Sequence, residues 1–115
     1  MRKNAFFVFK GDPMCFVHVL LNALDMSEKG DDVKVIIEGE SVKLLPELVK
    51  KENPLHSLWE KAVSKGLIEG VCFACAKKLG TYDEAKRQGL PLLDDMSGHA
   101  GIAGWQEKGY TVITF

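Results

Sequence analysis

The 115-residue chain lacks both a long apolar run and an excess of charge of one sign. Fifteen Lys and Arg against sixteen Asp and Glu give a formal net charge of −1, which excludes a field that attracts nucleic acid or an anionic membrane. No apolar run approaches the roughly 20 residues of a membrane-spanning helix. The five apolar residues before Lys10 are also too few for a signal peptide, which needs about 7–15. We therefore expect a cytoplasmic protein without membrane or nucleic-acid partners.

Cysteine is scarce as well, with only three in the chain. A small secreted disulfide scaffold carries a denser and usually even set, so this class is excluded. Two of the three form Cys72-Phe73-Ala74-Cys75, a spacing that indicates thiol, redox or metal chemistry. Cys15 lies where an apolar helix is predicted, and we interpret it first as a small hydrophobic residue and only secondarily as a binding residue.

The rest of the composition is that of one ordinary globular domain covering residues 1–115, with 46% hydrophobic and 27% charged residues. Strand-length apolar runs alternate with segments of helical periodicity. The predicted strands are Asn4–Lys10, Asp32–Glu38, Val71–Ala74, Pro91–Leu93 and Tyr110–Phe115. The predicted helices start at Phe16, Ser41, Asn53-Pro54, Cys75, Thr81 and Gly98, the last running to Lys108. This alternation predicts a three-layer α/β/α domain with a mainly parallel five-stranded sheet.

Ligands of open parallel sheets bind beyond the carboxyl ends of the strands. In this chain those ends are the loops Lys10–Cys15, Glu38–Ser41, Cys72–Lys78 and Asp94–His99, together with the C-terminus. All three cysteines and His99 fall in these loops. We therefore expect the functional site at this edge of the sheet.

The Cys72/Cys75 pair lies where a strand is predicted to enter a helical turn. Free amide groups at a helix N-terminus lower the pKa of a thiol, and Lys77 and Lys78 add positive charge. Because the thiolate is the nucleophile, we predict Cys75 and Cys72 as catalytic residues, with both lysines in support. His99, beside the predicted helix cap Ser97, is a candidate acid, base or anion ligand.

Other uses of a Cys-x-x-Cys pair stay open at this point. Zinc needs four ligands, so Cys15, His18 or His99 would have to complete a site around the pair. A thioredoxin-like dithiol would have to face Leu90-Pro91. The adjacent carboxylates Asp94-Asp95 are by themselves a weak signal for a hard cation. The prediction is a protein that needs neither metal nor another cofactor.

The segment Gly70-Val71-Cys72-Phe73-Ala74-Cys75-Ala76-Lys77-Lys78-Leu79-Gly80 resembles the DsrE/DsrF-like family of small α/β proteins. The likeness extends over nearly the whole chain, including the Leu-Pro-Leu-Leu segment and the closing Gly-Tyr-Thr-Val-Ile-Thr-Phe strand. It implies a sulfur carrier or sulfurtransferase whose cysteine accepts persulfide sulfur and passes it on. It also implies protein partners that donate and accept sulfur, and assembly as a homo-oligomer, a trimer or hexamer.

The resemblance leaves open which cysteine accepts the sulfur. A cysteine followed by small apolar residues, a basic pair and glycine assigns the role to Cys72. The Phe73-Ala74-Cys75 pattern of more distant members assigns it to Cys75. Two cysteines depart from the single-cysteine pattern, so one thiol could resolve a persulfide on the other as a disulfide. The alternative hypothesis is a non-catalytic oligomeric module of the same fold, which binds a small ligand or responds to redox state.

Overall fold

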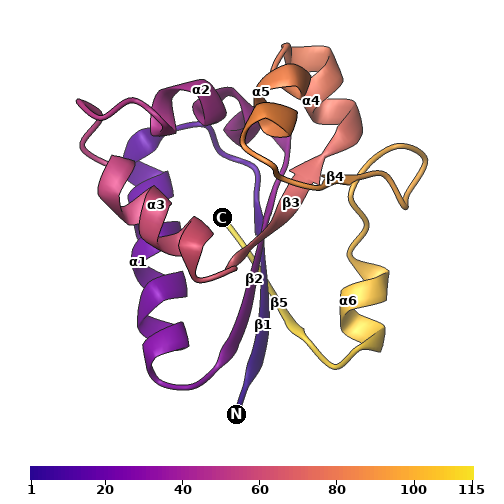
Figure 1. The fold of residues 1–115 in the computed structure, drawn as a ribbon. Coiled ribbons are helices and arrows are strands. Elements are labelled where there is room, and N and C mark those ends of the chain that lie inside the picture. The colour runs from indigo at the N-terminus through magenta and orange to yellow at the C-terminus, as the bar shows by residue number, and fades with distance from the viewer.

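Five parallel strands form the centre of the computed structural model, which describes residues 1–115 (Figure 1). The strands are β1 (Lys3–Val8), β2 (Asp32–Ile37), β3 (Ile68–Cys72), β4 (Leu92–Leu93) and β5 (Thr111–Thr114). Their order across the sheet is β4-β3-β2-β1-β5. The predicted α/β class and five-stranded sheet are confirmed, and every strand pair is parallel.

Helices cover the sheet unequally on its two faces. The helical segments are α1 (Pro13–Glu28), η1 (Gly39–Leu44), α2 (Leu45–Leu48), α3 (His56–Ser64), α4 (Phe73–Leu79), α5 (Tyr82–Arg87) and α6 (Ala103–Glu107). Figure 1 shows α1 and α3 on one side of the sheet and α6 on the other. None of these helices has the length and apolar character needed to cross a membrane.

Alternation along the strands produces one large and one small core, because successive side chains point to opposite faces. Phe6, Val35 and Val71 belong to a cluster of 23 buried residues on the α1 side. Phe7 and Cys72 belong to a cluster of five buried residues on the α6 side. Cys72 therefore lies under the thinner of the two layers.

The first helix begins three residues before the predicted Phe16. The Asp12 side chain accepts a hydrogen bond from the backbone N–H of Met14 at 2.8 Å, and Pro13 occupies the first helical position. Both residues favour the start of a helix. The Asp12 side chain accepts a hydrogen bond from a backbone N–H that has no partner within the helix, and Pro13 has no backbone N–H that would need one. This start places Cys15 in the first turn of α1.

The predicted strand Val71–Ala74 is shifted in the structure. β3 begins at Ile68, because Leu67 and Ile68 are buried beside β2, and it ends at Cys72. Phe73 and Ala74 already belong to α4. Gly70 is needed within β3, because a Cβ there would lie 2.7 Å from the Pro91 carbonyl oxygen as the chain approaches β4.

The predicted helix Gly98–Lys108 is wrong over its first half. Only Ala103–Glu107 is helical, and Ser97 does not cap a helix. Ser97 and Gly98 have φ angles of 49° and 87°, which continue no right-handed helix. They form a tight turn in which the N–H groups of Met96 and His99 each donate to the other's carbonyl at 2.8 Å.

Candidate functional site

The carboxyl end of β3 supplies both cysteines of the Cys-x-x-Cys pair. Cys72 is the last strand residue and the N-cap of α4, with extended backbone, and Cys75 follows one helical turn later. Cys72 is fully buried, whereas Cys75 is partly exposed. The two thiols of one motif therefore differ in access from solvent.

The loop of residues 94–102 folds back over the start of α4. The turn at residues 96–99 is held against α4 by a hydrogen bond from the Ala74 N–H to the Gly98 carbonyl at 2.9 Å. The positive φ of Gly98 favours glycine at this position, and a Cβ added there would lie 3.9 Å from the Ala74 methyl group, an ordinary contact. The next residue, His99, is thereby placed over the two cysteines.

His99 Nδ1 lies 3.4 Å from Cys72 Sγ and 3.8 Å from Cys75 Sγ. The two sulfur atoms and a ring nitrogen of His99 all lie within 4.8 Å of one another. The ring can donate to a thiolate or accept a thiol proton, depending on its tautomer. The structure therefore brings together three residues predicted at the sheet edge, and it gives His99 contacts with both thiols.

The expected lowering of the thiol pKa is wrong for Cys75. Burial and the neighbouring Cys72 raise the pKa of Cys75 to about 11, and a hydrogen bond from the Gly39 backbone N–H opposes this only in part. The charge of Glu38 raises it further. Desolvation therefore outweighs the helix start that the sequence suggested, because a buried thiol loses the water that stabilises its charged form.

The two predicted lysines, Lys77 and Lys78, have different surroundings. Lys77 Nζ lies 3.9 Å from the centroid of the Tyr82 ring, a cation–π contact that directs it toward the aromatic pair Phe73 and Tyr82. Lys78 lines the same pocket as Cys75. Of the two, only Lys78 is placed to meet a ligand beside the thiol.

That pocket has a volume of about 290 Å³ and opens beside α4 and η1. Its lining residues are Gly39, Glu40, Ala74, Cys75, Lys78, Leu79 and His99. Cys72 is not among them. A small molecule or a partner's side chain entering here meets the sulfur of Cys75 first.

Glu38 is a residue of the site that the sequence did not reveal. It follows β2 directly, is 8% exposed, and its Oε2 has no hydrogen-bond partner. Burial raises the pKa of this carboxyl from 4.5 to about 7. Its place in the Glu38–Ser41 loop was the available signal, but nothing in a lone glutamate after a strand indicates that it will be buried.

The structure does not bring Cys15 or His18 to this group. Both lie in the first half of α1 and line a separate pocket of about 200 Å³ with Lys10 and Phe115. Pro91 is also elsewhere, with its carbonyl accepting the N–H of Val71 at 2.8 Å within the sheet. Neither of the first two completes a metal site with the Cys72/Cys75 pair.

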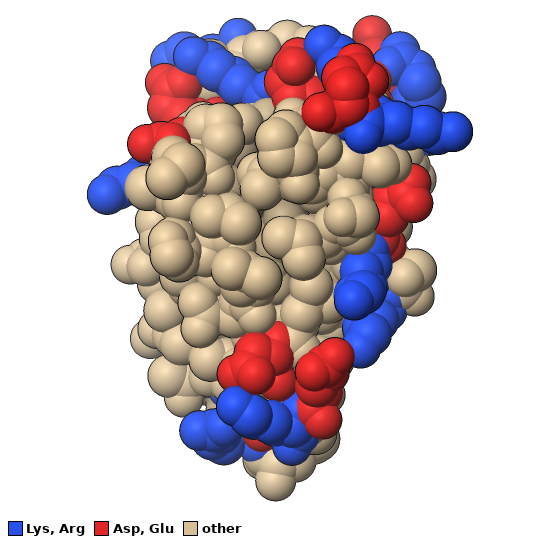
Figure 2. Space-filling model, turned by 90° about the vertical axis from the view of Figure 1, so that its left-hand side faces the viewer, with Lys and Arg blue, Asp and Glu red and all other residues tan.

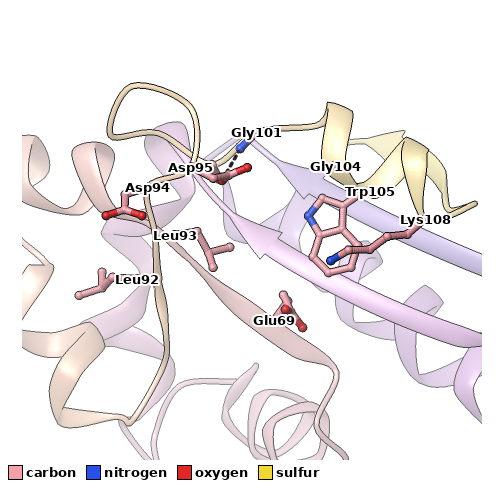
Figure 3. A pocket seen from close by; sticks show the side chains of 10 residues that line it. Glu69, Leu92, Leu93, Asp94, Asp95, Gly101, Gly104, Trp105 and Lys108 are labelled. Carbon is pink, nitrogen blue, oxygen red and sulfur yellow. Dashed lines mark hydrogen bonds between the residues drawn. The ribbon is translucent and has the colours of Figure 1, made fainter.

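A second pocket near the loop contains the predicted Asp94-Asp95 pair (Figure 3). It has a volume of about 320 Å³ and lies between β3, β4 and α6, with Trp105 and Lys108 on its α6 side. Asp95 Oδ1 accepts the backbone N–H of Gly101 at 3.1 Å, so this carboxylate closes the loop. Asp95 is therefore accounted for without a cation, and Asp94 is exposed.

Several known proteins are similar to this chain in sequence or in fold. An uncharacterized protein, MJ0733, of Methanocaldococcus jannaschii is 36% identical over 117 aligned positions, which cover 96% of this chain and 93% of that protein. An uncharacterized protein of Archaeoglobus fulgidus is 40% identical over 40 residues, 35% of this chain and 66% of that one. A conserved protein of unknown function from Bacteroides thetaiotaomicron, BT1422, has the same fold, with a TM-score of 0.70 at 16% identity over 98% of this chain and 95% of that chain.

The family comparison agrees with the resemblance seen around the cysteines. A model of the DsrE/DsrF-like family matches residues 3–115, nearly the whole chain. The alignment with MJ0733 likewise covers 96% of this chain and 93% of that protein. The chain therefore belongs to the DsrE/DsrF-like family, whose general role is sulfur relay.

Proposed function

We propose that the protein is a cytoplasmic sulfur carrier in which Cys75 accepts persulfide sulfur from one protein and passes it to another. The observation that carries the proposal is the placement of a partly exposed thiol in a pocket, in contact with a histidine, within a sulfur-relay family. Between the two cysteines, access favours Cys75, because Cys72 is fully buried beneath the 94–102 loop.

The transfer is a thiol–persulfide exchange without net oxidation. The Cys75 thiolate attacks the outer sulfur of a donor persulfide, R–S–SH, and forms a new S–S bond. The donor's S–S bond breaks, and R–S⁻ leaves with the bonding electron pair. The proton lost by Cys75 balances R–S⁻, so that Cys75–SH and R–S–SH become Cys75–S–SH and R–SH. Attack by an acceptor thiolate on the outer sulfur then regenerates Cys75.

In this proposal His99 takes the thiol proton. With the pKa of Cys75 at about 11, only roughly one thiol in 10,000 is ionised at neutral pH. Nδ1 of His99, 3.8 Å from Cys75 Sγ, can receive the proton in the tautomer that carries its hydrogen on Nε2. The exchange therefore relies on local proton transfer rather than on a standing thiolate.

Cys72 provides a second reaction for the persulfide on Cys75. Its sulfur lies within 4.8 Å of that of Cys75. Attack of Cys72 on the inner sulfur of Cys75–S–SH forms a Cys72–Cys75 disulfide and releases H₂S. In the absence of an acceptor, this reaction unloads the carrier and leaves it oxidised.

We further propose that the chain works as a homo-oligomer, a trimer or hexamer. Figure 2 shows the side of the molecule that carries α1 and α3, where charged side chains gather at the two ends and along one edge, and the middle of the face is uncharged. Leu21 on α1 is 47% exposed and Val63 on α3 is 36% exposed. Apolar side chains on an uncharged face are suited to contact with other copies of the chain.

Whole-protein mass spectrometry tests the proposed function. The reduced protein is incubated with a cysteine desulfurase and its cysteine substrate, in the presence of a metal chelator. We expect a gain of one sulfur atom in the wild type and in Cys15→Ser, and no gain in Cys75→Ser. Cys72→Ser should retain its extra sulfur longer, because the disulfide cannot form. Absence of any gain in the wild type would instead favour a non-catalytic binding module.

A further inference from the structure

We propose that Cys72, Cys75 and His99 also bind a single Zn²⁺ ion, with the fourth coordination position open to the pocket beside Cys75. The inference goes beyond sulfur transfer, although it concerns the same two sulfur atoms. The three residues come from the end of β3, the first turn of α4 and the 94–102 loop, and the turn at Gly98 brings the third to the first two.

The separations among the three ligand atoms fit a tetrahedral zinc site. With Zn–S near 2.3 Å and Zn–N near 2.0–2.1 Å, two ligands of a tetrahedral ion lie about 3.6 Å apart for S and N and about 3.8 Å apart for two sulfurs. The observed distances from His99 Nδ1 are 3.4 Å to Cys72 Sγ and 3.8 Å to Cys75 Sγ. All three ligand atoms lie within 4.8 Å, so small side-chain rotations suffice to surround one ion.

The residues around the cluster carry charges of both signs. Glu38 is nine-tenths buried, its Oε2 has no hydrogen-bond partner, and its charge acts on Cys75. Lys78 lines the pocket beside Cys75, whereas Lys77 packs on Tyr82, so the choice of ion depends on the donor atoms. Two thiolates with one imidazole are a donor set that prefers thiophilic ions such as Zn²⁺ over hard cations.

The surroundings also resemble those that hold metal ligands in place. The backbone N–H of Gly39 acts to lower the pKa of the Cys75 thiol, and this favours the thiolate form that binds a metal. Three protein ligands and an open position are the pattern of zinc sites that exchange their fourth ligand. The pocket of about 290 Å³ that contains Cys75 and His99 supplies room for that ligand.

Zinc and sulfur transfer exclude one another in this site. A Cys75 sulfur bound to Zn²⁺ cannot carry an outer sulfur atom at the same time as it holds the ion in this geometry. Bound zinc therefore protects Cys75 from alkylation, and removal of zinc restores its reactivity.

The test titrates ZnCl₂ into the reduced, metal-free full chain in competition with a chromophoric chelator. We expect one Zn²⁺ per chain. His99→Ala, an exposed position where folding is not at risk, should weaken binding about 100-fold or more, because the loss of a second-shell partner alone costs 10–100-fold. Cys72→Ala and Cys75→Ala should do the same. With Co²⁺ in place of zinc, the visible spectrum should be that of a four-coordinate site with thiolate charge-transfer bands.

Cys15→Ser and His18→Ala are matched controls, because they remove a cysteine and a histidine that lie together on α1 away from the site. Both should bind zinc like the wild type. Failure of the wild type to bind zinc would overturn the proposal, as would binding that survives His99→Ala or is lost in a control. A six-coordinate Co²⁺ spectrum would overturn it as well.

The two proposals fail separately. Zinc binding is measured without any sulfur donor, and sulfur loading is measured with a chelator present. A chain that binds zinc but gains no sulfur contradicts the carrier function alone. A chain that gains sulfur on Cys75 but binds no zinc contradicts only the metal site.

Discussion

Cys72 and Cys75 differ by three positions in sequence but have different surroundings and accessibility. Cys72 points into the small core beneath the 94–102 loop, whereas Cys75 lines a pocket. Hydrophobic periodicity predicts where the strands end, and it therefore predicts that both cysteines lie at the carboxyl edge of the sheet. Which thiol is accessible depends on the fold of residues 94–102, and no local pattern around the cysteines conveys that.

The raised pKa of Cys75 predicts how fast the thiol reacts at different pH values. In metal-free Cys15→Ser protein, the rate of iodoacetamide alkylation should climb by about tenfold per pH unit from neutral pH toward pH 10, without levelling off, because the thiolate fraction is still growing. Peptide mapping should find the label on Cys75 and not on buried Cys72. A plateau close to pH 7 would instead indicate the lowered pKa that a helix start and two lysines suggest.

Glu38 provides a second prediction at the residue scale. Its pKa is raised by burial from 4.5 to about 7, so the folded protein prefers the neutral carboxyl. The stability associated with this group is complete below pH 4.5 and is lost as pH rises through about 7. In Glu38→Gln, the fall in the free energy of unfolding between about pH 5 and about pH 8 should shrink by about 1–3 kcal/mol.

Urea denaturation of both proteins at the two pH values measures this difference. Glu40→Gln is the matched control, since Glu40 is exposed and pairs with Lys43 at the surface, and it should leave the pH dependence unchanged. An equal fall in the wild type and in Glu38→Gln would show that the carboxyl is already ionised well below pH 7.

At the scale of elements, the sequence predicts those segments whose structure is decided by residues within or next to them. Asp12-Pro13 starts α1, and the apolar runs of β1 and β2 form strands with a neighbour on either side. Residues 98–102 of the 94–102 loop are predicted as helix, because Ser97 is a plausible cap for a helix over Gly98–Lys108. The true form of the loop depends on contacts across the fold, namely Gly98 with Ala74 and Gly101 with Asp95. These contacts place His99, so the wrongly predicted segment is the one that completes the site.

Two glycines in this region should respond to alanine in opposite directions. Gly98 has a φ of 87°, so Gly98→Ala should lower the free energy of unfolding by about 1–2 kcal/mol. Gly104 lies in α6 with no atom within 4 Å of an added Cβ, so Gly104→Ala should raise it by about 0.5–1 kcal/mol. Denaturant unfolding of the two variants tests the turn, and equal effects would contradict the geometry of residues 97–98.

At the scale of the whole molecule, the uncharged α1/α3 face predicts how the chain assembles. If copies meet through this face, a charge placed in its middle should prevent assembly, because burying an unpaired carboxylate is costly. Light scattering should find the wild type as a trimer or hexamer and Leu21→Glu as a smaller species. Met96→Glu, at an exposed position in the 94–102 loop, should assemble like the wild type. A wild-type monomer, or an assembled Leu21→Glu variant, would contradict this interface.

The measurement that tests the account most directly is the location of the transferred sulfur in the wild-type chain. The protein is loaded from a desulfurase donor in the presence of chelator, the persulfide is capped by alkylation, and the peptides are mapped by mass spectrometry. The account predicts the additional sulfur on Cys75, with none on Cys15 and with Cys72 modified only as part of a disulfide to Cys75. Additional sulfur on Cys72 while Cys75 remains a free thiol would contradict the account.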